Sequence, residues 1–285
     1  MRNLIYASLL RLSMDWLKAL FLLLATLLVM PAGAVTPYNE SCGAAARPVD
    51  TEGGTNLTRG ENTRAGERNP ITGTLKVLVI AIEFTDVNHT MSLSTFESRI
   101  SGMDSYYREV SYGNVSITGD VAPKWYRSSR TMAYYGADAG GGHDNANVPI
   151  YYLVLEAIDL ANPDINYHDY DTDGDGYLDH LIVVHAGRDQ ASSGDPNDIW
   201  SHRGNLNAYK DGVYITSYVL VSEFSPLSVF CHEFGHDLLL PDLYDYGYDS
   251  DGLGVWSLMA GGTVYGSSPA HFDPWCKYYL GWIEP

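Results

Sequence analysis

The sequence has 285 residues, of which 45% are hydrophobic and 18% are charged, a composition typical of a globular chain rather than a disordered one. Its 35 acidic residues outnumber its 17 basic residues and give a net charge of −18. This balance argues against nucleic acids and anionic membrane surfaces as partners, because both require a basic surface. The surplus of carboxylates instead favours a hard cation such as calcium.

The N-terminal segment has the organisation of a secretory signal peptide. Basic residues precede an apolar run at 19–30, and small residues follow it up to Ala34. The run is too short to span a membrane comfortably, and the small residues suit cleavage after Ala34. An uncleaved anchor and a start at Met14 are the alternatives. We therefore predict a signal peptide at 1–34 and a secreted, extracellular protein with no other membrane segment.

Residues 35–72 are rich in Gly, Thr, Asn and Arg and show no sustained periodicity, which predicts an extended leader or a pro-segment. The three cysteines, Cys42, Cys231 and Cys276, cannot form a complete disulfide framework. One bridge with one remaining thiol is open as an alternative. Folding of the exported chain is therefore not expected to depend on disulfides.

Residues 73–285 alternate between strand and helix patterns and are predicted to form one domain. In the helix predicted at 147–162, the face expected to be buried carries Tyr151, Val154, Leu155 and Ile158. A Gly-rich and Tyr-rich tail follows residue 240. This order predicts an α+β fold, with helices packed on a twisted mixed sheet and a smaller irregular C-terminal subdomain. The predicted elements are a strand at 74–84, a helix at 92–111, a strand at 113–123, a helix at 147–162, strands at 178–187 and 213–224, and a helix from 225 onward.

This last helix carries the sequence HEFGH at 232–236. His232 and His236 are one helical turn apart, so both imidazoles project from the same face and can share one metal ion. Glu233, beside the first histidine, can take a proton from a water and pass it to a leaving amine. Zinc suits this chemistry because it lowers the pKa of a bound water from about 15.7 to about 7. A chance occurrence of the five-residue pattern is the alternative.

Flanking residues support a helix at this point. Ser225 is expected to cap the helix with its hydroxyl, and Pro226 suits the first helical position. An apolar stripe along the helix predicts that the face carrying it is buried. The stripe consists of Leu227, Phe230, Cys231, Phe234 and Leu238.

Two histidines leave a zinc site one protein ligand short, and three aspartates lie nearby. Asp237 directly follows His236, about 100° around the helix, and is poorly aimed. Asp242 lies just beyond Pro241, which must end the helix, so a chain reversal there brings it back to the metal. Asp245 is a reserve ligand or a partner that supports a ligand histidine.

The run HEFGHDLLLPDLYD (232–245), followed by GVWSLMAGG (254–262), resembles the immune inhibitor A-like family of secreted zinc metallopeptidases in the metzincin clan. The similarity extends from about residue 74 to the end, through DTDGDGYLDHLIVVHAG and HFDPWCKYYLGW. It implies a zincin-like or metzincin-like catalytic domain. It also implies His232, His236 and Asp242 as zinc ligands, Glu233 as general base, and Met259 in the turn beneath the metal.

Two positions depart from this family's pattern. The family has HExxHxxGxxD, and Leu239 stands where the glycine belongs, in a bend that suits a left-handed residue. The resemblance also implies a tyrosine after the methionine turn that stabilises the transition state. The nearest candidate is Tyr265, for which a surface position is the alternative. The family is expected to continue beyond residue 285, so the sequence is interpreted as a truncated form.

A second motif, DYDTDGDGYLD (169–179), resembles a calcium-binding loop. Its aspartates fall at positions 1, 3, 5 and 9 of an EF-hand-type loop, and Tyr177 offers a backbone carbonyl. Ile182 occupies the position of the usual glutamate, so a looser calcium loop is predicted, with an unoccupied acidic turn as the alternative. A second acidic cluster at 244–252 has uninformative spacing. The predicted ligands are Asp171, Asp173, Asp175, Tyr177 and Asp179.

These features predict a secreted, monomeric zinc endopeptidase that holds a protein or peptide substrate along an edge strand and carries structural calcium. One alternative is a catalytically weak or inactive calcium-binding exported protein of the same fold, in which Leu239 spoils the bend. Another is a calcium-dependent surface or adhesion module with an incidental HExxH helix. His185 and His202 are cleft-lining candidates, but a structural role is the interpretation preferred for both.

Overall fold

The computed structural model describes residues 70–284, except 140–141 and 248. The predicted signal peptide at 1–34, residues 35–69 of the predicted leader, and Cys42 lie outside the described residues. Among the residues described, no helix is long and apolar enough to cross a membrane.

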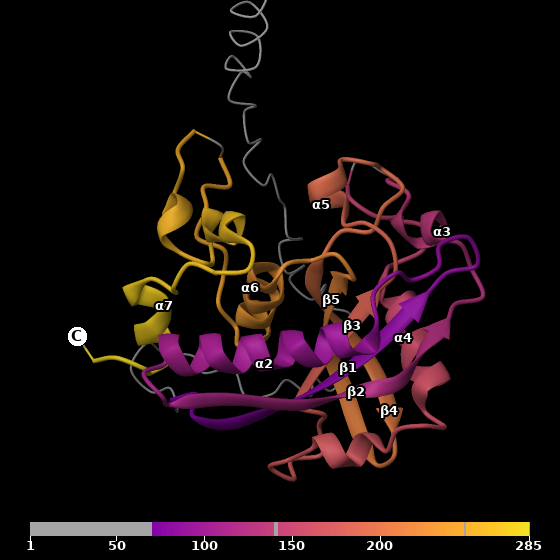
Figure 1. The fold of residues 1–285 in the computed structure, drawn as a ribbon, viewed down its shortest axis with the longest axis horizontal. Helices are drawn as coiled ribbons and strands as arrows, with labels where there is room; N and C mark the ends of the chain where they lie inside the picture. Colours follow the sequence, from indigo (N-terminus) through magenta and orange to yellow (C-terminus); the bar gives the residue numbers. More distant parts are fainter. Residues whose placement is uncertain (1–69, 140–141, 248, 285) are drawn as a thin grey trace, which may run out of the picture. The chain divides into compact units, whose positions relative to one another are not determined.

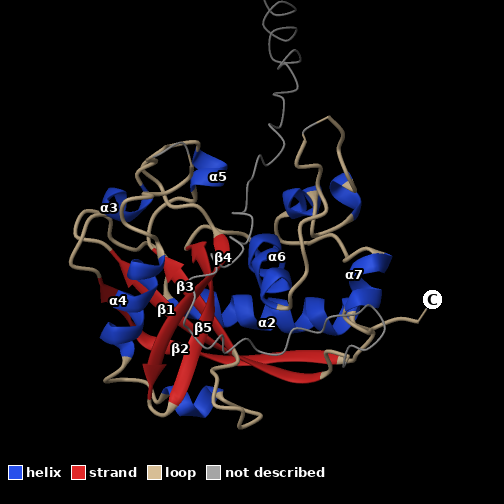
Figure 2. Ribbon diagram, turned by 180° about the vertical axis from the view of Figure 1, so that it is seen from behind, coloured by secondary structure: helices blue, strands red, loops and turns tan. Residues whose placement is uncertain are grey.

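The core of the domain is a five-stranded mixed sheet in the order β2-β1-β3-β5-β4 (Figures 1 and 2). Four strands run parallel, and β4 pairs antiparallel with β5 at one edge. The predicted α+β class with a mixed sheet is confirmed. The strands are β1 (Gly73–Glu83), β2 (Val115–Arg127), β3 (His180–His185), β4 (His202–Lys210) and β5 (Val213–Ser222).

Both faces of the central strands are buried, which explains their nearly continuous apolar sequences. Along β1, Val77 and Val79 face a core shared with α2 (Leu93–Val110) and α6 (Leu227–Asp237). The alternate residues Leu78 and Ile80 face a second core shared with α4 (Tyr151–Ala161). The period of two along a strand therefore divides the helices between the two faces of the sheet.

The remaining helical elements are short and were not predicted. Several end within one turn, too short for a 3.6-residue periodicity to appear in the sequence. They are α3 (Met132–Gly136), η1 (Tyr167–Tyr170), α5 (Gln190–Ser193), η2 (Gly254–Trp256), η3 (Gly261–Tyr265) and α7 (Pro274–Tyr279).

Two details of the predicted helices are wrong. In α4 the buried face is centred on Leu153, Val154, Ala157 and Ile158, whereas Tyr151 and Leu155 are only partly buried. For α6, the helix begins at Leu227 with no side-chain cap. The Ser225 hydroxyl instead accepts a hydrogen bond from the Ser222 N–H at 3.1 Å and stabilises the preceding turn.

The segment after α6 is irregular, as expected, but it shares the core of α2 and α6. Leu258, Met259, Phe272 and Trp282 are buried in that cluster. The other two cysteines, Cys231 and Cys276, are buried there as free thiols. No disulfide therefore joins the two cysteines that the structure describes.

Candidate metal centre

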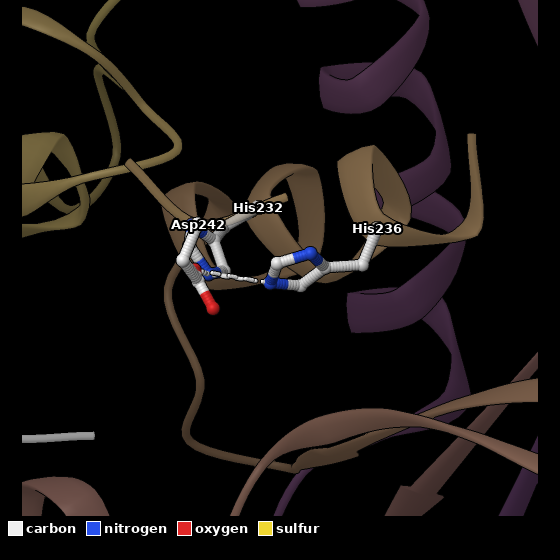
Figure 3. Close-up of side chains that lie close together, drawn as sticks. All are labelled: His232, His236 and Asp242. Carbon is white, nitrogen blue, oxygen red and sulfur yellow. Dashed lines mark hydrogen bonds and ion pairs between the residues drawn. The ribbon is translucent and has the colours of Figure 1, made fainter. Parts of the chain in front are cut away.

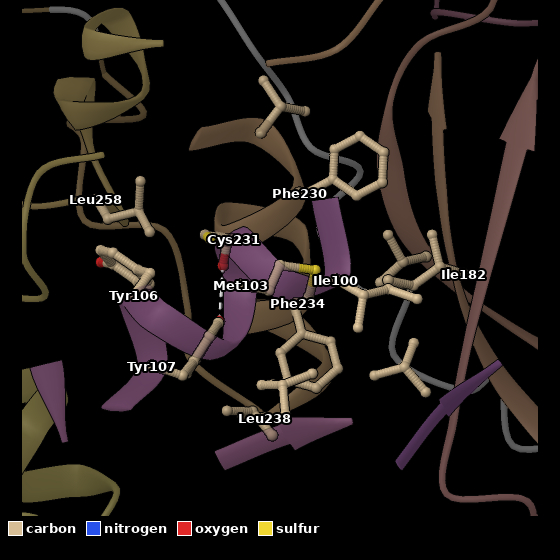
Figure 4. Packing of buried hydrophobic residues seen from close by; sticks show 14 of the residues in the cluster. Ile100, Met103, Tyr106, Tyr107, Ile182, Phe230, Cys231, Phe234, Leu238 and Leu258 are labelled. Atoms are coloured by element: carbon tan, nitrogen blue, oxygen red, sulfur yellow. Dashed lines mark hydrogen bonds between the residues drawn. The ribbon is translucent and has the colours of Figure 1, made fainter. Parts of the chain in front are cut away.

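Helix α6 is oriented by the apolar face that it packs on α2. Cys231 and Phe234 are fully buried against Met103 and Tyr107 (Figure 4). The Tyr107 hydroxyl also donates a hydrogen bond to the backbone carbonyl of Cys231 at 2.8 Å. Because this face is fixed to the core, His232 and His236 project away from α2.

Three side-chain atoms converge beside α6 (Figure 3). The Nε2 atoms of His232 and His236 are 3.1 Å apart, and each lies 3.2 Å from Asp242 Oδ1. A tetrahedral zinc ion with ligand bonds of about 2.0–2.1 Å would hold its ligand atoms about 3.3 Å apart. The three atoms are therefore spaced as the ligands of one ion would be.

The outer nitrogens of both imidazoles are fixed by backbone carbonyls. His232 Nδ1 donates to Leu258 O, and His236 Nδ1 donates to Leu240 O, both at 2.8 Å. A carbonyl only accepts, so each Nδ1 carries the proton and each Nε2 keeps a lone pair for a metal. Sequence reasoning missed both supports, because a carbonyl has no residue-type signature.

The carboxylate of Asp242 is buried and charged. Burial acts to raise its pKa, whereas hydrogen bonds and charge from His232 and His236 in their protonated form hold it well below its usual range, and a cation in place of those protons would favour the charged carboxylate in the same way. Asp242 Oδ1 has no hydrogen-bond partner among the described residues. A buried anionic oxygen without a donor is costly, so a cation is the natural complement of this atom.

Leu239 occupies the left-handed position predicted for the missing glycine, with φ of 69°. Around it, Leu239 N–H donates to His236 O and Leu240 N–H donates to Gly235 O, at 2.9 and 3.0 Å. This pair of bonds is a Schellman motif, in which glycine is the usual left-handed residue. The bend therefore keeps its geometry in spite of the leucine, and it delivers Asp242 to the histidines.

Met259 lies beneath the helix, at the place implied for the methionine turn. Its side chain is fully buried, and a Cβ added at Gly235 would lie 2.7 Å from Met259 Sδ. The same turn supplies Leu258 O to His232 and accepts Leu243 N–H on Met259 O at 2.6 Å. The turn thus contacts the helix, one histidine and the segment that carries Asp242.

Glu233 is buried next to the first histidine, with a relative exposure of 1%. Burial raises its pKa to about 8, the negative charges of Asp242 and Asp189 act in the same direction, and His232 opposes them. Its Oε2 atom has no hydrogen-bond partner among the described residues. The side chain is therefore a buried carboxyl group with one oxygen available to a water or substrate.

The other two aspartates considered as third ligands have different partners. Asp237 Oδ2 lies 2.6 Å from His180 Nδ1, and Asp237 Oδ1 accepts from the Ser217 hydroxyl at 3.0 Å. Asp245 does not support a ligand histidine, and that expectation is wrong. Its carboxylate instead accepts the backbone N–H groups of Gly247, Asp249 and Ser250 and closes its own loop.

The acidic loop before β3 brings three of its predicted ligands together. One carboxylate oxygen from each of Asp171, Asp173 and Asp179 lies within 4.8 Å of the others. Asp175 lies outside this group, and its N–H donates to Asp171 Oδ1 and Asp173 Oδ1 at 3.0 and 3.1 Å. Tyr177 N–H donates to Asp175 Oδ1 at 2.9 Å, which tightens the same turn.

The remaining candidates differ in position. His185 and His202 donate from Nδ1 to the carbonyls of Ala186 and Trp200, and burial lowers the pKa of both imidazoles. The lowered pKa values favour the neutral form of both imidazoles. Tyr265 ends η3 with 52% of its surface exposed.

The donor set and its buried glutamate define a metallopeptidase-type site. The sequence agrees, because the profile of the immune inhibitor A peptidase M6 catalytic domain matches residues 88–282. The chain belongs to the immune inhibitor A peptidase M6 family. Members of this family are metallopeptidases, so a metal cofactor accompanies the fold.

Two relatives carry metalloprotease or immune inhibitor names. Pre-pro-metalloprotease PrtV of Vibrio cholerae is 32% identical over 216 residues, covering 62% of this chain and 23% of PrtV. Immune inhibitor A of Bacillus thuringiensis subsp. alesti is 32% identical over 222 residues, covering 64% of this chain and 32% of the relative. The chain therefore spans about a quarter to a third of the length of these relatives.

Solved structures show a weaker likeness. OgpA from Akkermansia muciniphila has a TM-score of 0.40 at 14% identity, covering 76% of this chain and 63% of OgpA. Metalloproteinase-II from Bacteroides fragilis has a TM-score of 0.35 at 15% identity, covering 77% of this chain and 56% of that protein. These scores are too low to carry a structural argument.

Proposed function

We propose that the protein is a secreted zinc-dependent endopeptidase. The observation that carries this proposal is the convergence of two histidine Nε2 atoms and Asp242 Oδ1 at 3.1–3.2 Å from one another. The Nε2 lone pairs of both imidazoles are directed to the space between these three atoms, and the buried Asp242 Oδ1 has no hydrogen-bond donor among the described residues. Nitrogen and oxygen donors in a set of three, with one further position open, suit catalytic zinc.

When bound, zinc supplies Lewis acidity that polarises the scissile carbonyl and acidifies a water. The chain contributes the proton transfers through Glu233. Its Oε2 accepts the proton of the attacking water and then gives that proton to the leaving amine nitrogen. Burial raises the pKa of Glu233 to about 8 in the metal-free protein, and a zinc ion at the site would lower it toward the range in which the group both takes and returns a proton near neutral pH.

We assign substrate binding to strand β4. It pairs with β5 on one side, and within the described residues its other edge carries no strand. A hydrogen bond from the backbone of Arg203, on β4, offsets a small part of the rise in the Glu233 pKa. This strand therefore lies beside the proposed base. An extended peptide that adds to the free edge through main-chain hydrogen bonds would pass the site.

We further propose that the acidic loop binds calcium through Asp171, Asp173 and Asp179. Their three oxygens within 4.8 Å support this assignment, because carboxylates in such proximity repel one another without a cation. The loop also accepts Tyr214 N–H on Gly176 O at 2.8 Å, which links it to the start of β5. Calcium there is expected to stabilise this end of the sheet.

Zinc content and casein cleavage by the purified protein test the proposed activity. We expect about one zinc ion per chain, and we expect Glu233→Gln to retain the zinc and to lose about a hundredfold or more in cleavage rate. Glu97→Gln, on the exposed face of α2, is the matched control and should cleave normally. Zinc-loaded wild-type protein that cleaves no faster than Glu233→Gln would exclude the enzyme and favour a binding protein.

A further inference from the structure

The two oxygens of the Asp242 carboxylate have different surroundings. Oδ1 lies 3.2 Å from both histidine Nε2 atoms and has no hydrogen-bond partner among the described residues. Oδ2 accepts the Tyr244 hydroxyl at 3.0 Å and more distantly the Tyr246 hydroxyl at 3.5 Å. One oxygen is therefore left for a cation, and the other is held by a phenol.

We propose that Tyr244 is a positioning residue that holds Asp242 as a ligand through one oxygen. The inference rests on the proposed zinc site and assigns the group that orients its third ligand. A hydrogen bond on Oδ2 opposes rotation of the carboxylate and disfavours binding through both oxygens. The Oδ1 lone pairs then remain directed toward the space that the two Nε2 lone pairs also face.

The position of Asp242 in the chain explains why such a support is required. His232 and His236 are held by a regular helix, and their Nδ1 atoms are held by carbonyls. Asp242 lies five residues beyond the last residue of that helix, after the left-handed Leu239. The helix does not fix the torsion angle of this carboxylate, so an additional donor has to do so.

Tyr244 is itself placed by the methionine turn. Its neighbour Leu243 donates its N–H to Met259 O at 2.6 Å and accepts Leu253 N–H on its carbonyl at 3.1 Å. These two bonds fix the backbone one residue before Tyr244. The turn beneath the helix thereby supports two of the three ligands, His232 through Leu258 O and Asp242 through Tyr244.

Tyr246 provides a matched comparison in the same loop. Its hydroxyl is directed to the same oxygen at 3.5 Å, the limit of a hydrogen bond, and its side chain is 55% exposed. Tyr244 is nearer and only partly exposed. Removing the two hydroxyls separately therefore distinguishes a specific hydrogen bond from a general effect of tyrosines in this loop.

The test measures metal affinity independently of peptidase activity. Metal-free wild type, Tyr244→Phe and Tyr246→Phe are titrated with zinc in competition with a chromogenic chelator. We expect Tyr244→Phe to bind zinc about 10–100-fold more weakly, the range typical of lost support for a metal ligand, and Tyr246→Phe to remain near wild type. In the cobalt(II)-substituted proteins, we expect an altered visible absorption spectrum for Tyr244→Phe alone.

Two controls separate the outcomes. The zinc-induced rise in unfolding temperature, taken from each variant's own metal-free value, keeps the comparison valid if a substitution lowers stability. Wild-type zinc affinity and a wild-type cobalt spectrum in Tyr244→Phe would overturn the role of Tyr244 and leave the zinc site standing. Zinc affinity that is unchanged in His232→Ala would overturn the proposed metal site, and this inference with it.

Discussion

Asp237 Oδ2 lies 2.6 Å from His180 Nδ1, and both side chains are buried. The residue that follows His236, the second proposed histidine ligand, is thus joined to the first residue of β3. Ser217 on β5 donates to the other oxygen of Asp237 at 3.0 Å. The C-terminal end of α6 is therefore attached to two neighbouring strands of the sheet.

Breaking this pair is expected to destabilise the domain strongly. Replacing His180 removes a buried hydrogen bond to a charged carboxylate, which typically costs about 1.5–3 kcal/mol, while Asp237 keeps Ser217 at 3.0 Å and Arg203 at 3.6 Å. We expect His180→Ala to lower the free energy of unfolding by about that amount in denaturant titrations. Asp159→Asn, which breaks the surface pair with Lys210, is the control and should change little. Equal effects of the two substitutions would contradict the assigned role.

The hydrogen bonds of the Glu156 carboxylate predict that the domain loses stability in acid. Its carboxylate accepts from the hydroxyls of Ser128 and Tyr135 at 2.6 and 2.9 Å and from the Ser129 N–H at 2.8 Å. Burial acts to raise its pKa, but these hydrogen bonds outweigh burial and lower it. Stability from a lowered pKa is present above the unfolded-state value of about 4.3 and is lost as pH falls through the folded-state value.

We therefore expect Glu156→Gln to cost about 1–2 kcal/mol at pH 7, because hydrogen bonds to a charged group are being replaced and the site is partly exposed. The difference from wild type should narrow below about pH 4, where the wild-type carboxylate is protonated. Denaturant unfolding at several pH values measures this difference in the free energy of unfolding. A difference that stays constant from pH 7 to pH 3 would argue against the charged hydrogen bonds as its source.

Leu239 is a site for stabilisation. A leucine at φ of 69° carries about 1 kcal/mol or more of backbone strain that glycine avoids. Its side chain is 62% exposed, so little packing is lost on removal. We expect Leu239→Gly to raise the free energy of unfolding by up to about 1 kcal/mol, because the greater freedom of glycine in the unfolded chain offsets part of the gain. Leu239→Ala keeps the strained backbone and should not stabilise the domain.

Calcium removal tests the acidic loop. We expect a calcium-selective chelator to lower the unfolding temperature of wild type, and Asp173→Asn to abolish most of that response. Asp249→Asn, in the second acidic cluster, should respond as wild type does. Differential scanning calorimetry with and without calcium measures both. If the unfolding temperature of wild type does not depend on calcium, the loop is an unoccupied acidic turn and the calcium proposal is wrong.

The sequence predicted the elements whose patterns are long and apolar. β1 and α2 were placed within one or two residues because buried runs and helical spacing are readable without tertiary context. β4 was missed, since its sequence HRGNLNAYK is polar and its strand form depends on pairing with β5. Propensity at such an edge strand is decided by its neighbours rather than by its own residues.

The candidate site also contains some residues that the sequence predicted and others that it did not. His232, Glu233 and His236 followed from helical spacing, and the motif with its family resemblance indicated Asp242. The supports of these residues did not follow, because Leu258 O and Leu240 O are carbonyls on turns and Tyr244 is one of 22 tyrosines. Asp237 was set aside as a ligand because of its direction on the helix, and its partner His180, 57 residues away in sequence, was not foreseen.

The hydrogen bond from His232 to Leu258 O spans 26 residues and has a consequence for the order of assembly. During synthesis, His232, His236 and Asp242 all emerge before Leu258 does. A chain interrupted between 242 and 258 would possess every proposed ligand and still lack the acceptor that sets the protonation of His232. A defined geometry for the proposed metal therefore requires residues up to the methionine turn, although every proposed ligand precedes that turn in the chain.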